Sequence, residues 1–121
     1  MLRRATTLAA RLAVAVLLIS SAAALGQNYS PSQAAYLKGE IRRAQERFVE
    51  QAAAVSGVSA DKIRQWVPTD GRDVPPKVRV VPALERERGK PMTDEERQKV
   101  LAADQARFDA IERAKRDALK K

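Results

Sequence analysis

The distribution of proline is the feature that most constrains how this 121-residue chain can fold. Five of its six prolines lie between residues 68 and 91, where they interrupt any long helix or central strand. The segments on either side carry apolar residues at helical spacing. We therefore expect an all-α fold, a small helical domain of two long amphipathic helices plus one short helix, with a Pro-rich extended segment between them.

The first long helix is expected at about 31–56. Pro31 suits a first helical position, and Gly57 suits a left-handed cap after the last turn. Ser59 can cap a short helix over about 59–67, which Pro68 ends. The apolar residues of the long helix fall on one narrow face, which comprises Leu37, Ile41, Ala44, Phe48, Ala52 and Val55.

The second long helix is expected at about 93–120, after an extended linker over 68–91 in which Lys77 to Val80 alternates like a short strand or a polyproline segment. Thr93 and Glu96 have the spacing of a capping box. We expect the two long helices to pack antiparallel, with Leu37, Ile41, Phe48 and Val55 against Leu101, Phe108 and Ile111. The apolar face of the second helix is interrupted by Arg97, Asp104 and Lys115.

The N-terminal segment has the organisation of a secretory signal peptide. Arg3, Arg4 and Arg11 precede the apolar run 12–19, and small residues follow. Cleavage after Ala24 and cleavage after Gly26 both fit, so we predict a signal peptide over 1–26, a domain over 27–121 and a periplasmic or secreted location. The apolar run is shorter than the roughly 20 residues of a membrane span, so we expect no stable membrane insertion after cleavage.

Charge favours an anionic partner. Without residues 1–26 the chain keeps 20 basic and 15 acidic residues, a surplus that suits phosphorylated lipid headgroups, acidic polymers or acidic proteins. A domain of roughly 95 residues also buries a small core. The sequence therefore permits a homodimer as well as a monomer.

Residue types argue against an enzyme. The chain has no histidine and no cysteine, hence no imidazole base, no thiol nucleophile and only oxygen ligands for a metal. We predict no catalytic residue, no metal ligand and no cofactor. Asp104 and Lys115 lie about 16 Å apart along a helix, so each needs a partner on another helix or in a ligand. The candidate partner-binding residues are Arg64, Trp66, Val78, Val80, Asp104 and Lys115.

One segment resembles the helix-turn-helix signature of DNA-binding proteins, at Ala53, Gly57, Val58, Ser59, Ile63 and Trp66. The resemblance implies that Ala60, Asp61, Arg64 and Gln65 face the major groove. A nucleic-acid-binding module centred on Gly57-Val58-Ser59 is therefore the alternative function. Pro68 and the predicted export signal argue against it, so nucleic acid is not the expected partner.

Met92 to Arg97, followed by a charged amphipathic helix, resembles the helix starts of small periplasmic stress chaperones. The resemblance implies a thin helical cradle that holds non-native polypeptide without ATP. Our leading hypothesis is a non-enzymatic exported helical protein that binds another protein or an anionic envelope component and, in one variant, acts like a chaperone.

Overall fold

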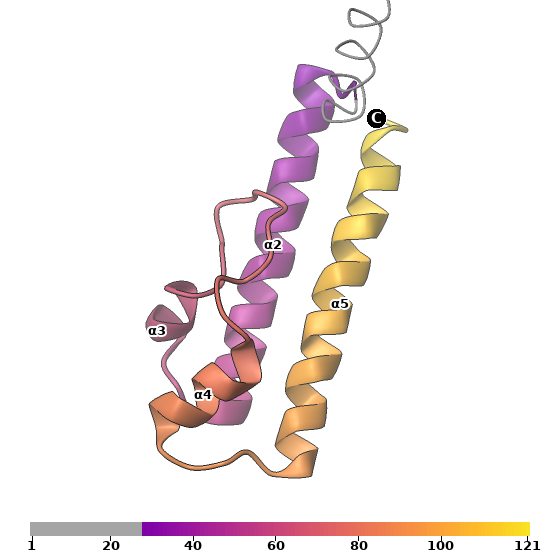
Figure 1. The fold of residues 1–121 in the computed structure, drawn as a ribbon. Helices are drawn as coiled ribbons and strands as arrows, with labels where there is room; N and C mark the ends of the chain where they lie inside the picture. The colour runs from indigo at the N-terminus through magenta and orange to yellow at the C-terminus, as the bar shows by residue number, and fades with distance from the viewer. Residues whose placement is uncertain (1–27) are drawn as a thin grey trace, which may run out of the picture. The chain divides into compact units, whose positions relative to one another are not determined.

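The computed structural model describes residues 28–121, and the predicted signal peptide lies outside the described residues. Pro31–Lys121 form one compact unit of four helices: α2 (Pro31–Ser56), α3 (Ala60–Arg64), α4 (Val80–Arg88) and α5 (Asp94–Ala118). The long helices α2 and α5 lie side by side and antiparallel, while α3, α4 and the loop between them gather beside α2 (Figure 1). Residues 28–121 contain no strand, which confirms the all-α prediction.

Caps at Thr93, Ser59 and Gly57 confirm three of the predicted helix ends. The Thr93 hydroxyl accepts the Glu96 backbone N–H at 3.1 Å, and the Glu96 carboxylate accepts the Thr93 N–H at 2.9 Å, which completes the capping box. Ser59 caps α3 in the same way, through the Lys62 N–H. Gly57, with φ of +78°, ends α2. The short helix has only five residues, because the chain turns after Arg64 instead of continuing to residue 67.

The core joins all four helices. Its main cluster contains Phe48, Val49 and Ala52 from α2, Val58, Ile63, Val67, Leu84 of α4, Met92, and Val100 and Ala103 of α5. A smaller cluster of Ile41, Ala44 and Ile111 continues it toward the far end of the helix pair. The long helices therefore pack along most of their length, and the short ones close one side.

The expected extended linker over 68–91 is wrong in its second half. Val80 begins α4, and Pro82 fits inside this helix because it lies in the first turn, where a backbone N–H has no helical partner. Ala83 and Leu84 are buried against the core, which stabilises the helix. Gly89, with φ of +76°, ends it. Of the segment Lys77 to Val80, expected as a short strand or a polyproline segment, Val80 belongs to α4 and the other three residues form no strand.

The predicted packing face of α5 is also partly wrong. Ile111 is buried as expected, but Leu101 and Phe108 are 49% and 54% exposed. The helix instead meets α2 through Val100 and Ile111 together with the small residues Ala103, Ala114 and Ala118. Alanines permit a close approach of the two backbones. The expected face was wrong because it was chosen from the large apolar residues and left the alanines out.

Arg88 connects the ends of three helices. Its guanidinium donates two hydrogen bonds of 2.8 Å to the Glu96 carboxylate and others to the carbonyls of Ser56, Lys90 and Pro91. The Arg88 side chain is only 9% exposed. Hydrogen bonds from Arg88, and then from the Thr93 backbone, hold the pKa of Glu96 at about 2, below its ordinary value of 4.5.

This arrangement predicts how stability depends on pH. Glu96 ionises at a lower pH in the folded chain than in the unfolded chain, so its contribution is complete above about pH 4.5 and is lost as the pH falls toward 2. We expect Glu96→Gln, which keeps the capping geometry, to lower the urea midpoint at pH 7. The difference from the wild type should shrink between pH 5 and pH 2. An unchanged difference across this range would contradict the assignment.

Candidate functional site

The loop between α3 and α4 is anchored to α2 by a buried amide. Gln45 is 1% exposed; its Oε1 accepts the Gly71 N–H at 3.0 Å and its Nε2 donates to the Arg72 carbonyl at 2.7 Å. The Lys77 N–H donates to the Trp66 carbonyl at 2.8 Å and closes the base of the loop. These hydrogen bonds hold the backbone of the loop against α2.

Gly71 lies at the closest contact between this loop and α2. Its φ is +86°, and a Cβ built on it would lie 2.6 Å from the Lys38 carbonyl oxygen. Only glycine combines that conformation with that approach. The loop also contacts α5, because the Asp73 carboxylate forms a salt bridge of 2.7 Å with the Lys115 ammonium.

The loop and α2 enclose a hollow of about 540 Å³ that we call the basic hollow. It is lined by Lys38, Arg42, Arg64, Pro68, Thr69, Asp70, Arg72 and Lys77. Arg64 pairs with Glu46 at 3.1 Å and with Asp61 at 2.8 Å, while Arg72 pairs with Asp70 at 2.6 Å. Within residues 28–121, the ammonium and guanidinium groups of Lys38, Arg42 and Lys77 have no acidic partner within ion-pair distance.

Neighbouring groups stabilise the charged forms of two residues in the basic hollow, Arg64 and Asp70. A hydrogen bond to Glu46 and the charge of that carboxylate raise the pKa of Arg64 above its ordinary value. Hydrogen bonds from the Arg72 backbone N–H and guanidinium lower the pKa of Asp70. Arg64 and Arg72 are paired with carboxylates, whereas the other three basic side chains of the lining are not, so the hollow carries a positive surplus suited to a phosphate or carboxylate group.

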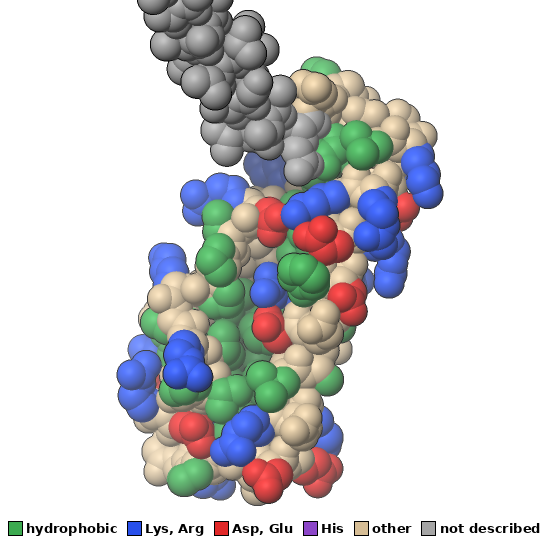
Figure 2. Space-filling model, turned by 45° about the vertical axis from the view of Figure 1, so that its right-hand side comes forward, with side chains coloured by type: hydrophobic (Ala, Val, Ile, Leu, Met, Phe, Trp, Pro, Cys, Tyr) green, Lys and Arg blue, Asp and Glu red, His purple; other side chains and the backbone are tan. Residues whose placement is uncertain are grey.

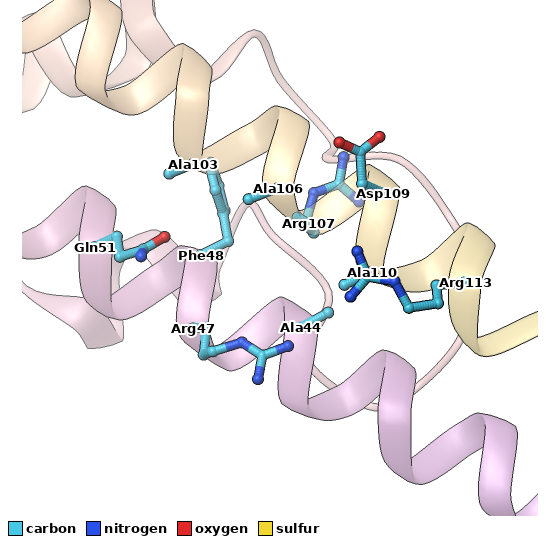
Figure 3. Close-up of a pocket in the computed structure, with 10 residues that line it drawn as sticks. All are labelled: Ala44, Arg47, Phe48, Gln51, Ala103, Ala106, Arg107, Asp109, Ala110 and Arg113. Atoms are coloured by element: carbon cyan, nitrogen blue, oxygen red, sulfur yellow. The ribbon is translucent and has the colours of Figure 1, made fainter. Parts of the chain in front are cut away.

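A second cavity, of about 430 Å³, lies between the two long helices. Figure 3 shows Arg47 of α2 and Arg113 of α5 on either side of Ala44 and Ala110. Arg107 also lines it, but its guanidinium pairs with Asp104 at 2.9 Å and lies over the Phe48 ring. With Asp109 in the lining as well, this cavity is less basic than the hollow.

A third depression, the apolar groove, lies between α5 and the start of α4 and has a volume of about 300 Å³. It is lined by Phe48, Pro76, Val78, Arg79, Val80, Val81, Pro82, Val100, Leu101 and Asp104. Figure 2 shows hydrophobic side chains gathered along the middle of one face of the molecule, with basic side chains along its left edge.

The six predicted partner-binding residues divide among four places. Val78, Val80 and Asp104 meet in the apolar groove, and Arg64 lies in the basic hollow. Trp66 is half-buried and packs against the core. Lys115 binds Asp73 and, on its own helix, Glu112 at 2.9 Å.

The sequence analysis missed the other four cations of the basic hollow and the amide that holds the loop in place. One signal was present: Gln45 falls within the buried stripe of α2, where a polar side chain needs partners. Lys38, Arg42, Arg72 and Lys77 gave no such signal, because basic residues on a helix surface or in a loop are ordinary.

Among residues 28–121, no group of three acidic side chains is arranged to hold a metal ion. No helix in this range is both long and apolar enough to cross a membrane.

Comparison with protein-family models, with curated proteins and with solved structures finds no match to this chain.

Proposed function

We propose that this protein is a non-enzymatic, exported binding protein that captures an anionic component of the cell envelope in the basic hollow. The observation that carries the proposal is the lining itself: five basic side chains from α2, α3 and the loop surround one hollow with a single acidic side chain. Three of those cations lack a counter-ion within the described residues. An anionic ligand would supply that counter-charge.

The placement of the free cations supports binding by several groups at once. Lys38 and Arg42 are one helical turn apart on α2, and Lys77 reaches the same hollow from the loop. Because Gln45 and the Trp66 carbonyl hold the loop, little backbone ordering has to occur on binding. A volume of about 540 Å³ is within the range of ligand sites.

The geometry of α3 supports DNA binding by a helix-turn-helix less well than it supports anion binding in the basic hollow. The candidate recognition helix, α3, has five residues. Its Arg64 is held in ion pairs with Glu46 and Asp61. Base recognition would have to break these pairs before the guanidinium could reach a base edge.

The proposal predicts a specific loss of binding. We expect the double substitution Arg42→Ala, Lys77→Ala to weaken binding of sodium polyphosphate by about tenfold or more, because two charge-assisted contacts are lost. The wild-type affinity should also fall steeply as salt is added. Binding is followed by the fluorescence of Trp66, the only tryptophan, whose carbonyl contacts the Lys77 backbone.

A matched control removes the same charge elsewhere. Arg86 and Lys90 are exposed basic residues that lie outside the basic hollow. We expect Arg86→Ala, Lys90→Ala to leave the affinity within about twofold of the wild type, since screening limits the effect of distant charges. Equal losses in the two double variants would mean that net charge, and not the hollow, determines binding.

A further inference from the structure

Residues 72–79, which we call the surface loop, form a wall shared by two depressions. Arg72 and Lys77 line the basic hollow, whereas Pro76, Val78 and Arg79 line the apolar groove. A cationic site and an apolar site therefore lie on either side of one short segment. A ligand that covers this segment meets both kinds of surface.

The surface loop also exposes apolar side chains. Val74 and Val78 are 38% and 36% exposed and belong to the five large hydrophobic residues exposed in the described chain. Between and beside them stand the exposed basic residues Lys77 and Arg79. The single acidic residue of the loop, Asp73, is bound to Lys115, so the outward charge of the loop is positive.

We infer that the surface loop docks on the surface of an anionic lipid bilayer. Val74 and Val78 enter the interfacial region, Lys77 and Arg79 bind lipid phosphates, and the basic hollow takes one headgroup. Basic side chains are attracted to anionic membrane surfaces, and small apolar side chains add to the binding when they leave water. This inference rests on the proposed function and identifies its anionic component.

Two features favour a bilayer over a soluble polyanion or an acidic protein segment. A polyanion needs only the cations and gives the exposed valines no apolar partner. The loop is moreover stiff: Pro75 and Pro76 separate the valines, and the Gln45 amide fixes the chain before them. Inserting a stiff loop costs little conformational entropy, so the burial of the two valines adds to the attraction between the basic residues and the lipid phosphates.

The test is sedimentation of the purified protein with phosphatidylcholine vesicles, with and without phosphatidylglycerol. We expect binding only where phosphatidylglycerol is present. The double substitution Val74→Ser, Val78→Ser should weaken vesicle binding by about tenfold while polyphosphate binding stays unchanged. Arg42→Ala, Lys77→Ala should weaken both. Leu119→Ser, which changes an exposed apolar residue outside the loop, should weaken neither.

Each other outcome has a separate meaning. Binding of polyphosphate without binding of anionic vesicles would overturn the bilayer inference and leave the proposed function standing. Binding of neither would overturn both. If Val74→Ser, Val78→Ser left vesicle binding unchanged, the bilayer inference would be overturned. Binding of polyglutamate that depends on the two valines would also overturn it and would indicate an acidic protein partner. As a control, circular dichroism of each variant should show the helix content of the wild type.

Discussion

Gly71→Ala is expected to lower the free energy of unfolding by about 3 kcal/mol, through a left-handed backbone penalty of about 1–2 kcal/mol and a steric clash. The new Cβ would lie 2.6 Å from the Lys38 carbonyl oxygen, a backbone atom in the second turn of α2 that cannot move alone. The loop must then shift away from α2 and lose its hydrogen bonds to Gln45. Thermal unfolding followed by circular dichroism should show a fall of roughly 15 °C in the melting temperature.

Gly57→Ala separates the two causes. Gly57 has φ of +78°, similar to that of Gly71, but a Cβ built there meets no other atom within 4 Å. Its replacement should cost only the backbone penalty of about 1–2 kcal/mol. If the two alanine variants lost the same stability, the close contact between the loop and α2 would be refuted. Gly71→Ala should also weaken polyphosphate binding, because Arg72 and Lys77 move with the loop.

Leu84→Ala is expected to cost about 3 kcal/mol, the usual loss when a fully buried leucine is truncated. Leu84 belongs to the main core cluster, although it lies in the segment that the sequence analysis took for an extended linker. In such a linker the same substitution would change stability by less than about 0.5 kcal/mol. Urea unfolding of the wild type and of Leu84→Ala decides between these values. The midpoint should shift while the dependence of the free energy of unfolding on urea concentration changes little.

Leu119→Ala supplies the reference for this measurement. Leu119 is exposed just after α5, so its truncation should be nearly neutral. Similar midpoints for Leu84→Ala and Leu119→Ala would contradict the packing of α4 on the core. A large difference would confirm that α4 is a structural part of the domain.

Local signals in the sequence were sufficient for the long helices. The capping residues Thr93, Glu96 and Ser59 act within their own turns, and Gly57 ends α2 by its own conformation, so no distant contact is needed to predict them. The helix α4 was missed because its start carries Pro82, a residue that is helix-compatible only in a first turn, and because its stability comes from burial of Leu84.

The candidate site was harder to predict because it is assembled from distant parts of the chain. Lys38 and Arg42 belong to α2, Arg64 to α3, and Arg72 and Lys77 to the loop. Their meeting depends on the contact of Gln45 with the backbone of Gly71 and Arg72, which pattern and propensity do not encode. Two residues of the apolar groove, Val78 and Val80, were predicted as binding residues, since they alternate with Lys77 and Arg79 in the sequence.

Asp104 and Lys115 illustrate the same limit. Their spacing along α5 showed that they need separate partners, and the structure supplies Arg107 for the first and Asp73 for the second. The expectation that Asp104 needs a partner on another helix or in a ligand is wrong, because Arg107 lies one turn away on the same helix. Lys115 pairs with Glu112 on the same helix and also with Asp73, which lies 42 residues earlier in the chain and is brought to Lys115 only by the docking of the loop.

Mapping of amide chemical shifts by NMR during titration with sodium polyphosphate tests the binding proposal most directly. If the basic hollow is the site, the largest changes should fall on Lys38, Arg42 and the loop residues Thr69 to Lys77, and they should reverse as salt is added. Changes concentrated at Arg47 and Arg113 would place the ligand in the cavity between the long helices instead. Either that result or the absence of any localised change would contradict binding in the basic hollow.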